Sequence, residues 1–119
     1  MRRASLIIKD VTDLLKRRDV LRLQRREDLR KEVRRELKEA LRRLAPGERI
    51  LVFGSVTRPY AFHERSDVDI AFVEEPKRYT RYALQARIEE MIHHSVDLVV
   101  LSECRFRDKI EREGEAWTI

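Results

Sequence analysis

The sequence contains very little cysteine, glycine and proline. Cys104 is the only cysteine among 119 residues, so an internal disulfide and a cysteine-based zinc site are both excluded. With three glycines and three prolines, the chain has no low-complexity linker, and it has no internal repeat. No apolar run reaches transmembrane length, and Lys9, Asp10 and Asp13 interrupt the run that follows the N-terminus. We therefore expect neither a leader nor a membrane span, and a cytoplasmic location.

Charge is abundant but unevenly distributed along the chain. Charged residues make up 41% of the sequence, and the net charge is +5. Residues 1–45 carry 16 Lys and Arg against 8 Asp and Glu, a net of +8, whereas residues 46–119 carry 11 against 14, a net of −3. The basic character thus belongs to the N-terminal third, and any metal or phosphate chemistry is expected in the acidic remainder.

A long helix is predicted at the N-terminus, because residues 11–44 contain neither glycine nor proline. Apolar residues recur there at helical spacing, more regularly in the second half than in the first. The pattern fits one long helix or two in series, ended by Pro46 and Gly47. Because acidic residues are interleaved with the basic ones, we expect a salt-bridged helix for packing or oligomerisation, and regard nucleic-acid binding as the weaker alternative.

The rest of the chain alternates between strand and helix signals. Short apolar runs predict strands over 49–53, 68–73 and 96–101, and helical periodicity predicts helices over 79–94 and 106–112. The structure of the last four residues, 116–119, is not predicted. The resulting order gives an α/β (α+β) domain over 1–119, with a small mixed sheet flanked by helices and a core over 49–115.

Two aspartates stand in the second of these strands, where carboxylates are disfavoured. Asp67 and Asp69 are two residues apart, so their side chains project from one face of the strand. Asp97 occupies the second position of the next strand, and if the two strands are neighbours three carboxylates converge. Their mutual repulsion is relieved by a divalent cation, and oxygen-only ligands favour Mg²⁺ or Mn²⁺.

A glycine and a serine follow the first strand. Gly54 permits close approach to the backbone, and Ser55 can cap a helical turn whose amides bind phosphate. The order of strand, Gly-Ser turn, paired aspartates and a later strand aspartate is typical of a site for metal and nucleotide.

The segments "GSVTRPYAFHERSDVDIAFV" and "VDLVVL" resemble the polymerase-β-type nucleotidyltransferase superfamily. They are most similar to its minimal nucleotidyltransferases, small proteins often encoded beside a HEPN-domain protein. The resemblance covers residues 49–115. Two features differ from the usual pattern: Pro59 stands where a glycine is common, and the interval from Gly54 to Asp67 is one residue longer.

The resemblance implies a role for each motif residue. Gly54 and Ser55 would hold the triphosphate of ATP, and Arg58 would contact phosphates. The catalytic and metal-binding residues would be three carboxylates: Asp67, Asp69 and Asp97. The last of these would position or deprotonate the attacking hydroxyl.

The activity implied by the resemblance is Mg²⁺-dependent transfer of AMP from ATP to a hydroxyl of a partner protein. The implied partner is a HEPN-family toxin, for which this protein would be the antitoxin. Two alternatives stay open: a non-catalytic antitoxin that blocks a HEPN ribonuclease by occlusion, and a nucleotidyltransferase for a small molecule such as an aminoglycoside. The N-terminal helix could also form a homo-oligomer.

Overall fold

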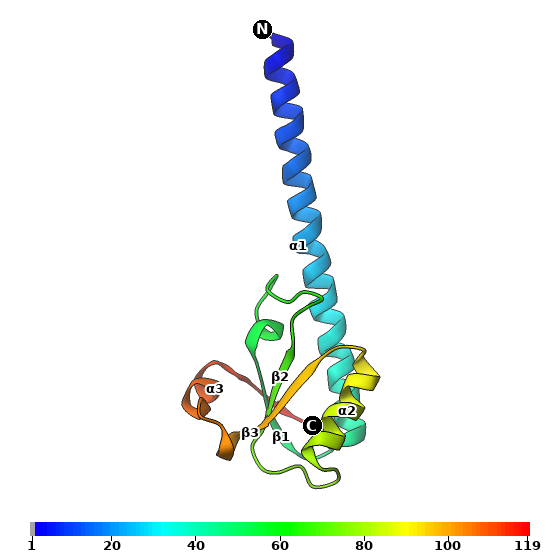
Figure 1. Cartoon of the computed structure of the whole chain (residues 1–119), viewed down its shortest axis with the longest axis vertical. Helices are drawn as coiled ribbons and strands as arrows, with labels where there is room; N and C mark the ends of the chain where they lie inside the picture. The colour runs from blue at the N-terminus through cyan, green and yellow to red at the C-terminus, as the bar shows by residue number, and fades with distance from the viewer. Residues whose placement is uncertain (1) are drawn as a thin grey trace.

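A computed structural model describes the backbone of residues 2–119 and the side chains from residue 11 onward. The chain forms a small body from which one long helix projects (Figure 1). That helix, α1 (Arg2–Leu44), is continuous, which decides between the one-helix and two-helix expectations. Within this described part of the chain, no helix is long and apolar enough to cross a membrane.

The body is built around a four-stranded sheet. Its strands are β1 (Arg49–Phe53), β2 (Val68–Phe72), β3 (Val96–Val100) and β4 (Glu115–Thr118), and their order across the sheet is β3-β2-β1-β4. β2 and β3 are parallel, whereas β1 runs antiparallel to both β2 and β4. The predicted small mixed sheet of the α+β class is therefore confirmed.

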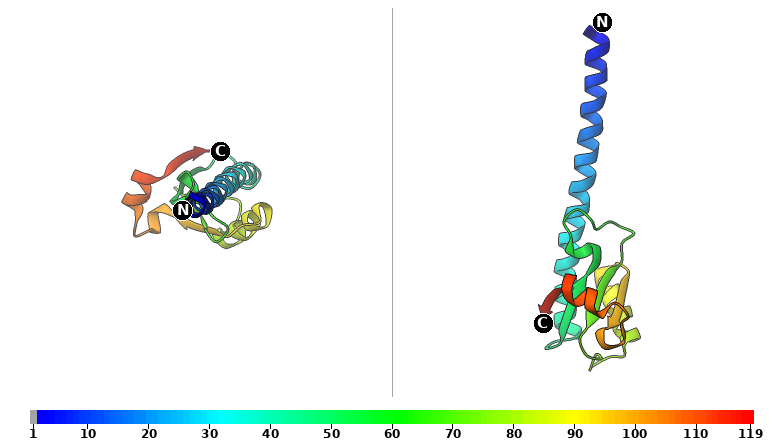
Figure 2. Two further views of the ribbon diagram at one scale, coloured as in Figure 1. Left: turned by 90° about the horizontal axis from the view of Figure 1, so that it is seen from above. Right: turned by 90° about the vertical axis from the view of Figure 1, so that its left-hand side faces the viewer.

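Helices cover both faces of the sheet. The C-terminal half of α1 packs together with α2 (Arg81–Ile92) on one face, over a core that includes Leu37, Leu41, Ile70 and Ile88. α3 (Arg107–Glu113) lies on the other face, where Ile110 packs against a smaller apolar cluster. Figure 2 shows the same arrangement from two further directions, with α1 and α3 on opposite sides of the strands.

Alternation along the strands separates these two faces. In β2, Val68, Ile70 and Phe72 belong to the core under α1 and α2, whereas Ala71 belongs to the cluster under α3. Because successive side chains of a strand point to opposite faces, Asp69 shares the α3 face with Ala71. The strand therefore buries one apolar face and presents its carboxylate on the other.

Two short 3-10 helices connect strands to the elements that follow them. η1 (Gly54–Thr57) begins directly after β1, and η2 (Leu101–Glu103) directly after β3. α2 is capped by Thr80, whose hydroxyl accepts a hydrogen bond from the Ala83 amide at 3.2 Å. As a crossover between parallel strands, α2 brings β3 alongside β2 and thereby brings the later aspartate to the earlier pair.

The C-terminal half contains a strand for which the sequence made no prediction. The last residues, 116–119, had no predicted structure, yet most of them form the edge strand β4, in which Trp117 is opposite Ile50. On and beside α2, Tyr82 is 81% exposed, whereas Tyr79 packs against the core. The sequence of β4, EAWT, lacks the run of apolar residues that identifies the other strands. Its strand conformation comes from its pairing with β1.

Candidate active site

The candidate site is a row of residues across three adjacent strands. Phe53 of β1 is opposite Asp69 of β2, and Asp69 is in turn aligned with Asp97 of β3. Adjacent strands lie only about 4.8 Å apart, so this register places the two carboxylates side by side on the α3 face. The predicted approach of Asp97 to the earlier aspartates is confirmed by this pairing.

Asp67 completes the cluster of acidic residues from just outside β2. It is exposed, whereas Asp69 is partly buried. His94 fixes the backbone just before Asp67, because its Nε2 lies 2.5 Å from the carbonyl oxygen of Ser66. The amide of Val68 also donates a hydrogen bond to the Ser95 carbonyl at 2.9 Å. The two residues just before β3 therefore fix the backbone on both sides of Asp67.

The electrostatics of the site centre on Asp69. Its pKa is raised to about 6, first by burial and then by the negative charges of Asp97 and Asp67. Burial and neighbouring negative charges destabilise the ionised form of a carboxylate. A cation beside it would offset that destabilisation, so the charge pattern and the all-oxygen donor set fit Mg²⁺ or Mn²⁺.

The three carboxylates do not form a finished metal-binding cage. Among the described side chains, no group of three or more His, Cys, Asp or Glu surrounds one point closely enough to hold a metal ion. The metal-binding roles of Asp67, Asp69 and Asp97 therefore stay a prediction. Magnesium sites of this chemistry are commonly completed by substrate phosphates rather than by protein ligands alone.

Gly54 is the point at which the turn meets the carboxylates. It has a φ of +77°, and a Cβ at this position would overlap Oδ2 of Asp69. Both the backbone conformation and the lack of space thus require glycine. The neighbour that requires glycine here is the central aspartate, and close approach of a phosphate to Gly54 stays a prediction.

The other predicted residues of the turn have different surroundings. Ser55 is half-buried within η1, and the N-cap of that helix is Phe53, which makes no side-chain capping bond. The expectation that Ser55 caps the turn is therefore wrong. Arg58 is exposed just beyond η1. The nucleotide-binding roles of Gly54, Ser55 and Arg58 stay predictions.

A cleft of about 720 Å³ opens beside this row. Gly54, Thr57, Arg58 and Asp97 line one part of it. The side toward α3 combines the apolar Val99, Cys104, Phe106 and Ile110 with the charged Lys109 and Glu113. Ser55, Asp67 and Asp69 are not among its lining residues; Asp69 lies behind Gly54. Clefts of this size accommodate a small-molecule ligand such as a nucleotide.

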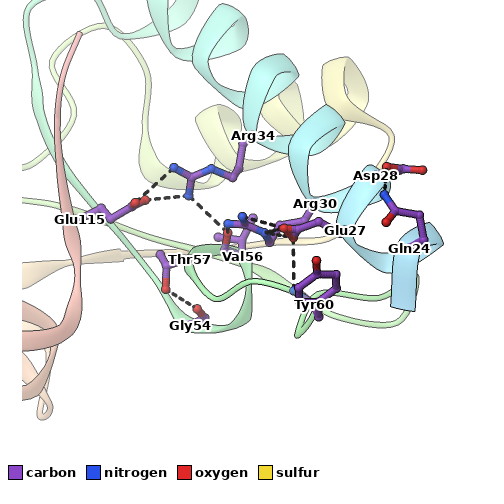
Figure 3. A network of polar contacts seen from close by, with 10 residues as sticks. All are labelled: Gln24, Glu27, Asp28, Arg30, Arg34, Gly54, Val56, Thr57, Tyr60 and Glu115. Atoms are coloured by element: carbon purple, nitrogen blue, oxygen red, sulfur yellow. Dashed lines mark hydrogen bonds and ion pairs between the residues drawn. The ribbon is translucent and has the colours of Figure 1, made fainter. Parts of the chain in front are cut away.

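Sequence reasoning missed the residues of α1 that hold η1 in place. Glu27, Arg30 and Arg34 form hydrogen bonds to the backbone at Val56 and Tyr60 (Figure 3). These contacts join residues 22 to 33 positions apart in the chain. No local pattern identifies such pairs, although a glutamate with arginines three and seven residues later on one helix face is visible in the sequence.

Comparison with known families identifies the body. Residues 35–116 match the family described as Polymerase beta, Nucleotidyltransferase. The chain belongs to this nucleotidyltransferase family. The matched segment runs from the second half of α1 into β4, so it contains β1, β2, β3, η1, the first two residues of β4 and all three aspartates.

Solved structures of similar fold come from toxin-antitoxin systems. A crystal structure of the toxin-antitoxin MntA-HepT is 22% identical, with a TM-score of 0.51 over 73% of this chain and 71% of that one. A toxin-antitoxin structure with AMP-PNP is 24% identical, with a TM-score of 0.53 over 71% and 73%. A mutant of MntA-HpeT is 23% identical, with a TM-score of 0.55 over 72% of each chain. At these identities the likeness establishes a shared nucleotidyltransferase fold. No curated protein matches the sequence significantly.

Proposed function

We propose that this nucleotidyltransferase transfers AMP from ATP to a hydroxyl of a partner protein, and that the partner is a HEPN-family toxin. The observation that carries the proposal is the row of Asp69 and Asp97 beside Gly54, at the edge of a nucleotide-sized cleft. The related folds support the biological setting, since they are toxin-antitoxin structures and one contains AMP-PNP.

The reaction assigns a task to each group of residues. The oxygen of the acceptor hydroxyl forms a bond to the α-phosphorus of ATP, and the bond from that phosphorus to the α,β-bridging oxygen breaks, which releases pyrophosphate. The hydroxyl proton passes to a carboxylate, for which Asp97, exposed on the cleft wall, is the candidate. Gly54 and Ser55 would orient the triphosphate, and Arg58 would offset its charge.

The aspartates fit a divalent cation, Mg²⁺ or Mn²⁺, held by Asp67, Asp69 and Asp97. Such an ion, when bound, neutralises negative charge that develops on the phosphates. The chain itself contributes the clustered carboxylates and the glycine that leaves room for them. A cytoplasmic location belongs to the same proposal, because ATP is the substrate.

The acceptor is proposed to be a protein because the body offers little to enclose a second substrate. The cleft is bordered by one short helix, α3, and by the loop after η1. A partner's surface would complete this open side and exclude water from the reaction. A small-molecule acceptor would need walls that the described residues do not provide.

Incubation of the purified protein with its partner toxin, Mg²⁺ and labelled ATP tests the proposal. Label at the α-phosphate should appear on the partner, and label at the γ-phosphate should not. The Asp67→Asn/Asp69→Asn variant should lose the activity, whereas Asp13→Asn, an exposed aspartate on the projecting helix, should retain it. Transfer of the γ-label would mean a kinase reaction instead.

A non-catalytic antitoxin is the second candidate, because the similar solved structures are toxin-antitoxin structures and a shared fold does not by itself require transfer of AMP. In that case the protein would inhibit the toxin by occlusion alone. Inhibition that is equally strong with and without ATP, and that survives Asp67→Asn/Asp69→Asn, would support this alternative.

A further inference from the structure

Glu27 is the only buried charged residue among the described side chains, with 5% of its surface exposed. It lies on α1, outside every motif that predicts the active site. Its Oε1 accepts a hydrogen bond from the backbone amide of Tyr60 at 3.2 Å and from Nε of Arg30 at 2.5 Å. A buried carboxylate is stable only when it is paired in this way. The bonds to Arg30 also keep the pKa of Glu27 below its usual value.

Two arginines of the same helix converge on one carbonyl of η1. Nη1 of Arg30 and Nη1 of Arg34 donate to the carbonyl oxygen of Val56, at 3.1 Å and 3.3 Å. Arg34 is itself held by two bonds to Glu115 of β4, at 2.6 Å and 3.2 Å. Figure 3 shows this network, with the side chains reaching from α1 to the turn and to the edge strand.

The network anchors a turn in which the two preceding carbonyls already have partners. The Gly54 carbonyl accepts from Oγ1 of Thr57 at 2.7 Å, and the Ser55 carbonyl accepts from the Arg58 amide at 3.1 Å. With Val56 held from α1, the first three carbonyls of η1 all have partners. Tyr60, held by Glu27, has a positive φ of 64° that needs such support.

We infer that Glu27, Arg30 and Arg34 are positioning residues that hold η1 in the conformation that binds the triphosphate. This inference rests on the proposed function, in which Gly54 and Ser55 receive the phosphates. A turn fixed before the ligand arrives loses less conformational entropy on binding, so affinity rises without a new contact. Arg30 acts through the turn, because each of its three guanidinium nitrogens already donates to Glu27 or to the Val56 carbonyl.

The Arg30→Lys/Arg34→Lys variant tests this role while it keeps both positive charges beside Glu27 and Glu115. A lysine ammonium cannot reproduce the forked contacts that reach Val56 and a carboxylate together. We expect affinity for Mg·ATP and for Mg²⁺ with inorganic triphosphate to fall about tenfold. In the transfer assay, KM for ATP should rise about tenfold, and kcat at saturating ATP should stay within about twofold.

The matched control is Arg35→Lys, because Arg35 is on the same helix and its ion pairs among the described side chains are with Glu36 and Glu39 of α1. It should bind triphosphate like the parent. Unchanged affinity in the double variant would overturn the positioning role. If the parent binds triphosphate but transfers no AMP, the proposed reaction fails, and the affinity of the double variant still decides the role of the network. A parent that binds no triphosphate would overturn both.

The α3 side of the cleft carries a second inference, from a different observation. Phe106 lines the cleft and is 67% exposed, so most of its large apolar side chain is in contact with solvent. Phe53 and Asp97 are each two residues along their strands from Leu51 and Val99, on the same face of the sheet. Leu51 and Val99 pack against the apolar cluster under α3. The cleft therefore runs from the carboxylates toward Phe106.

We propose that Phe106 stacks on the nucleobase of the bound nucleotide. This too rests on the proposed function, because phosphates at Gly54 direct the nucleoside along the cleft toward α3. Val99, Cys104 and Ile110 supply apolar surface on the way. Stacking of a base on an aromatic ring is strong enough to dominate affinity and does not require a particular base.

Comparison of two ligands isolates this contact. Phe106→Ala should weaken binding of Mg·ATP roughly tenfold and leave binding of inorganic triphosphate unchanged, whereas Phe106→Tyr should bind both like the parent. Tyr82→Ala is the control, an exposed aromatic on α2 outside the cleft. Equal affinity of Phe106→Ala and parent for ATP would overturn the proposal, as would a loss confined to binding of the partner toxin.

Discussion

The two halves of α1 use similar residues in opposite ways. From Leu29 to Leu44 the apolar side chains are buried or packed against the core. Between Val11 and Leu23 the side chains are exposed, and the six large apolar residues there have exposed fractions from 43% to 63%. One half of the helix is part of the body, and the other extends away from it (Figure 1).

This difference shows that helical propensity and tertiary packing are separate contributions. Both halves lack glycine and proline, so both can form helix. In the second half the apolar residues keep to one face, and burial of that face is what stabilises a helix in a folded protein. In the projecting half Leu14 and Leu21 share a face but Val20 and Leu23 lie off it, and all four are exposed. This half therefore depends on propensity and on continuity with the packed half.

The largest effect that separates the halves is expected from matched leucine truncations. Leu37 is fully buried, whereas Leu21 is 57% exposed. Leu37→Ala should lower the free energy of unfolding by about 2–5 kcal/mol, because it removes buried methyl groups and leaves a cavity. Leu21→Ala should change it by less than about 0.5 kcal/mol. Chemical denaturation of both variants measures the contrast, and equal losses would show that the projecting half is packed in solution.

An intermediate effect is expected at Asp69, where the body itself carries a destabilising charge. Its raised pKa means that the folded state binds a proton more tightly than the unfolded state. Without metal, the contribution of Asp69 to the free energy of unfolding should therefore fall as the pH rises from about 4 to about 6, and stay low above that. Asp69→Asn should remove this dependence and stabilise the metal-free protein at pH 7 by about 1–2 kcal/mol, after allowance for solvent screening.

Thermal melts with Mg²⁺ extend the same test. Added Mg²⁺ should raise the melting temperature of the parent at pH 7, raise it less at pH 5, and hardly affect Asp69→Asn. Asp13→Asn, on the projecting helix, is the control and should respond like the parent. A metal-induced shift of equal size in Asp69→Asn would remove this aspartate from the metal site.

The smallest effect is expected when most of the projecting half is deleted. Removal of residues 2–20 leaves Glu27, Arg30 and the packed half of α1 intact. The free energy of unfolding should change by less than about 0.5 kcal/mol, and triphosphate affinity should not change. Calorimetry on the shortened chain measures both quantities. A large fall in the free energy of unfolding would show that the removed residues pack against another part of the protein or a second copy of it.

Local signals explain what the sequence predicted well. Alternation identified β2, and two aspartates that break the alternation marked its functional face. The Gly-Ser pair after β1 located η1, because a positive φ and a close approach both need glycine. The strand aspartate Asp97 could be placed beside Asp69 because a helix between two strands implies a parallel crossover.

Long-range contacts explain what the sequence did not predict. Glu27 contacts Tyr60 across 33 residues, and Arg34 contacts Glu115 across 81. Strand β4 forms only through its pairing with β1. The salt-bridged surface expected for the whole helix is found on its packed half, as in Arg35 with Glu39 at 3.3 Å. Between described side chains, no ion pair involves the basic residues from Lys16 to Arg26.

The continuity of α1 governs how the protein moves through solvent. The protein measures 70 × 29 × 20 Å along its principal axes, and its radius of gyration is 19.3 Å. A compact chain of this length has a radius of gyration of roughly 13–14 Å. Such a rod-and-head particle experiences more friction than a sphere of equal mass and rotates more slowly about its short axes. A monomer should therefore elute early from a gel-filtration column, at the position of a larger globular protein, while light scattering reports a mass near 14.3 kDa.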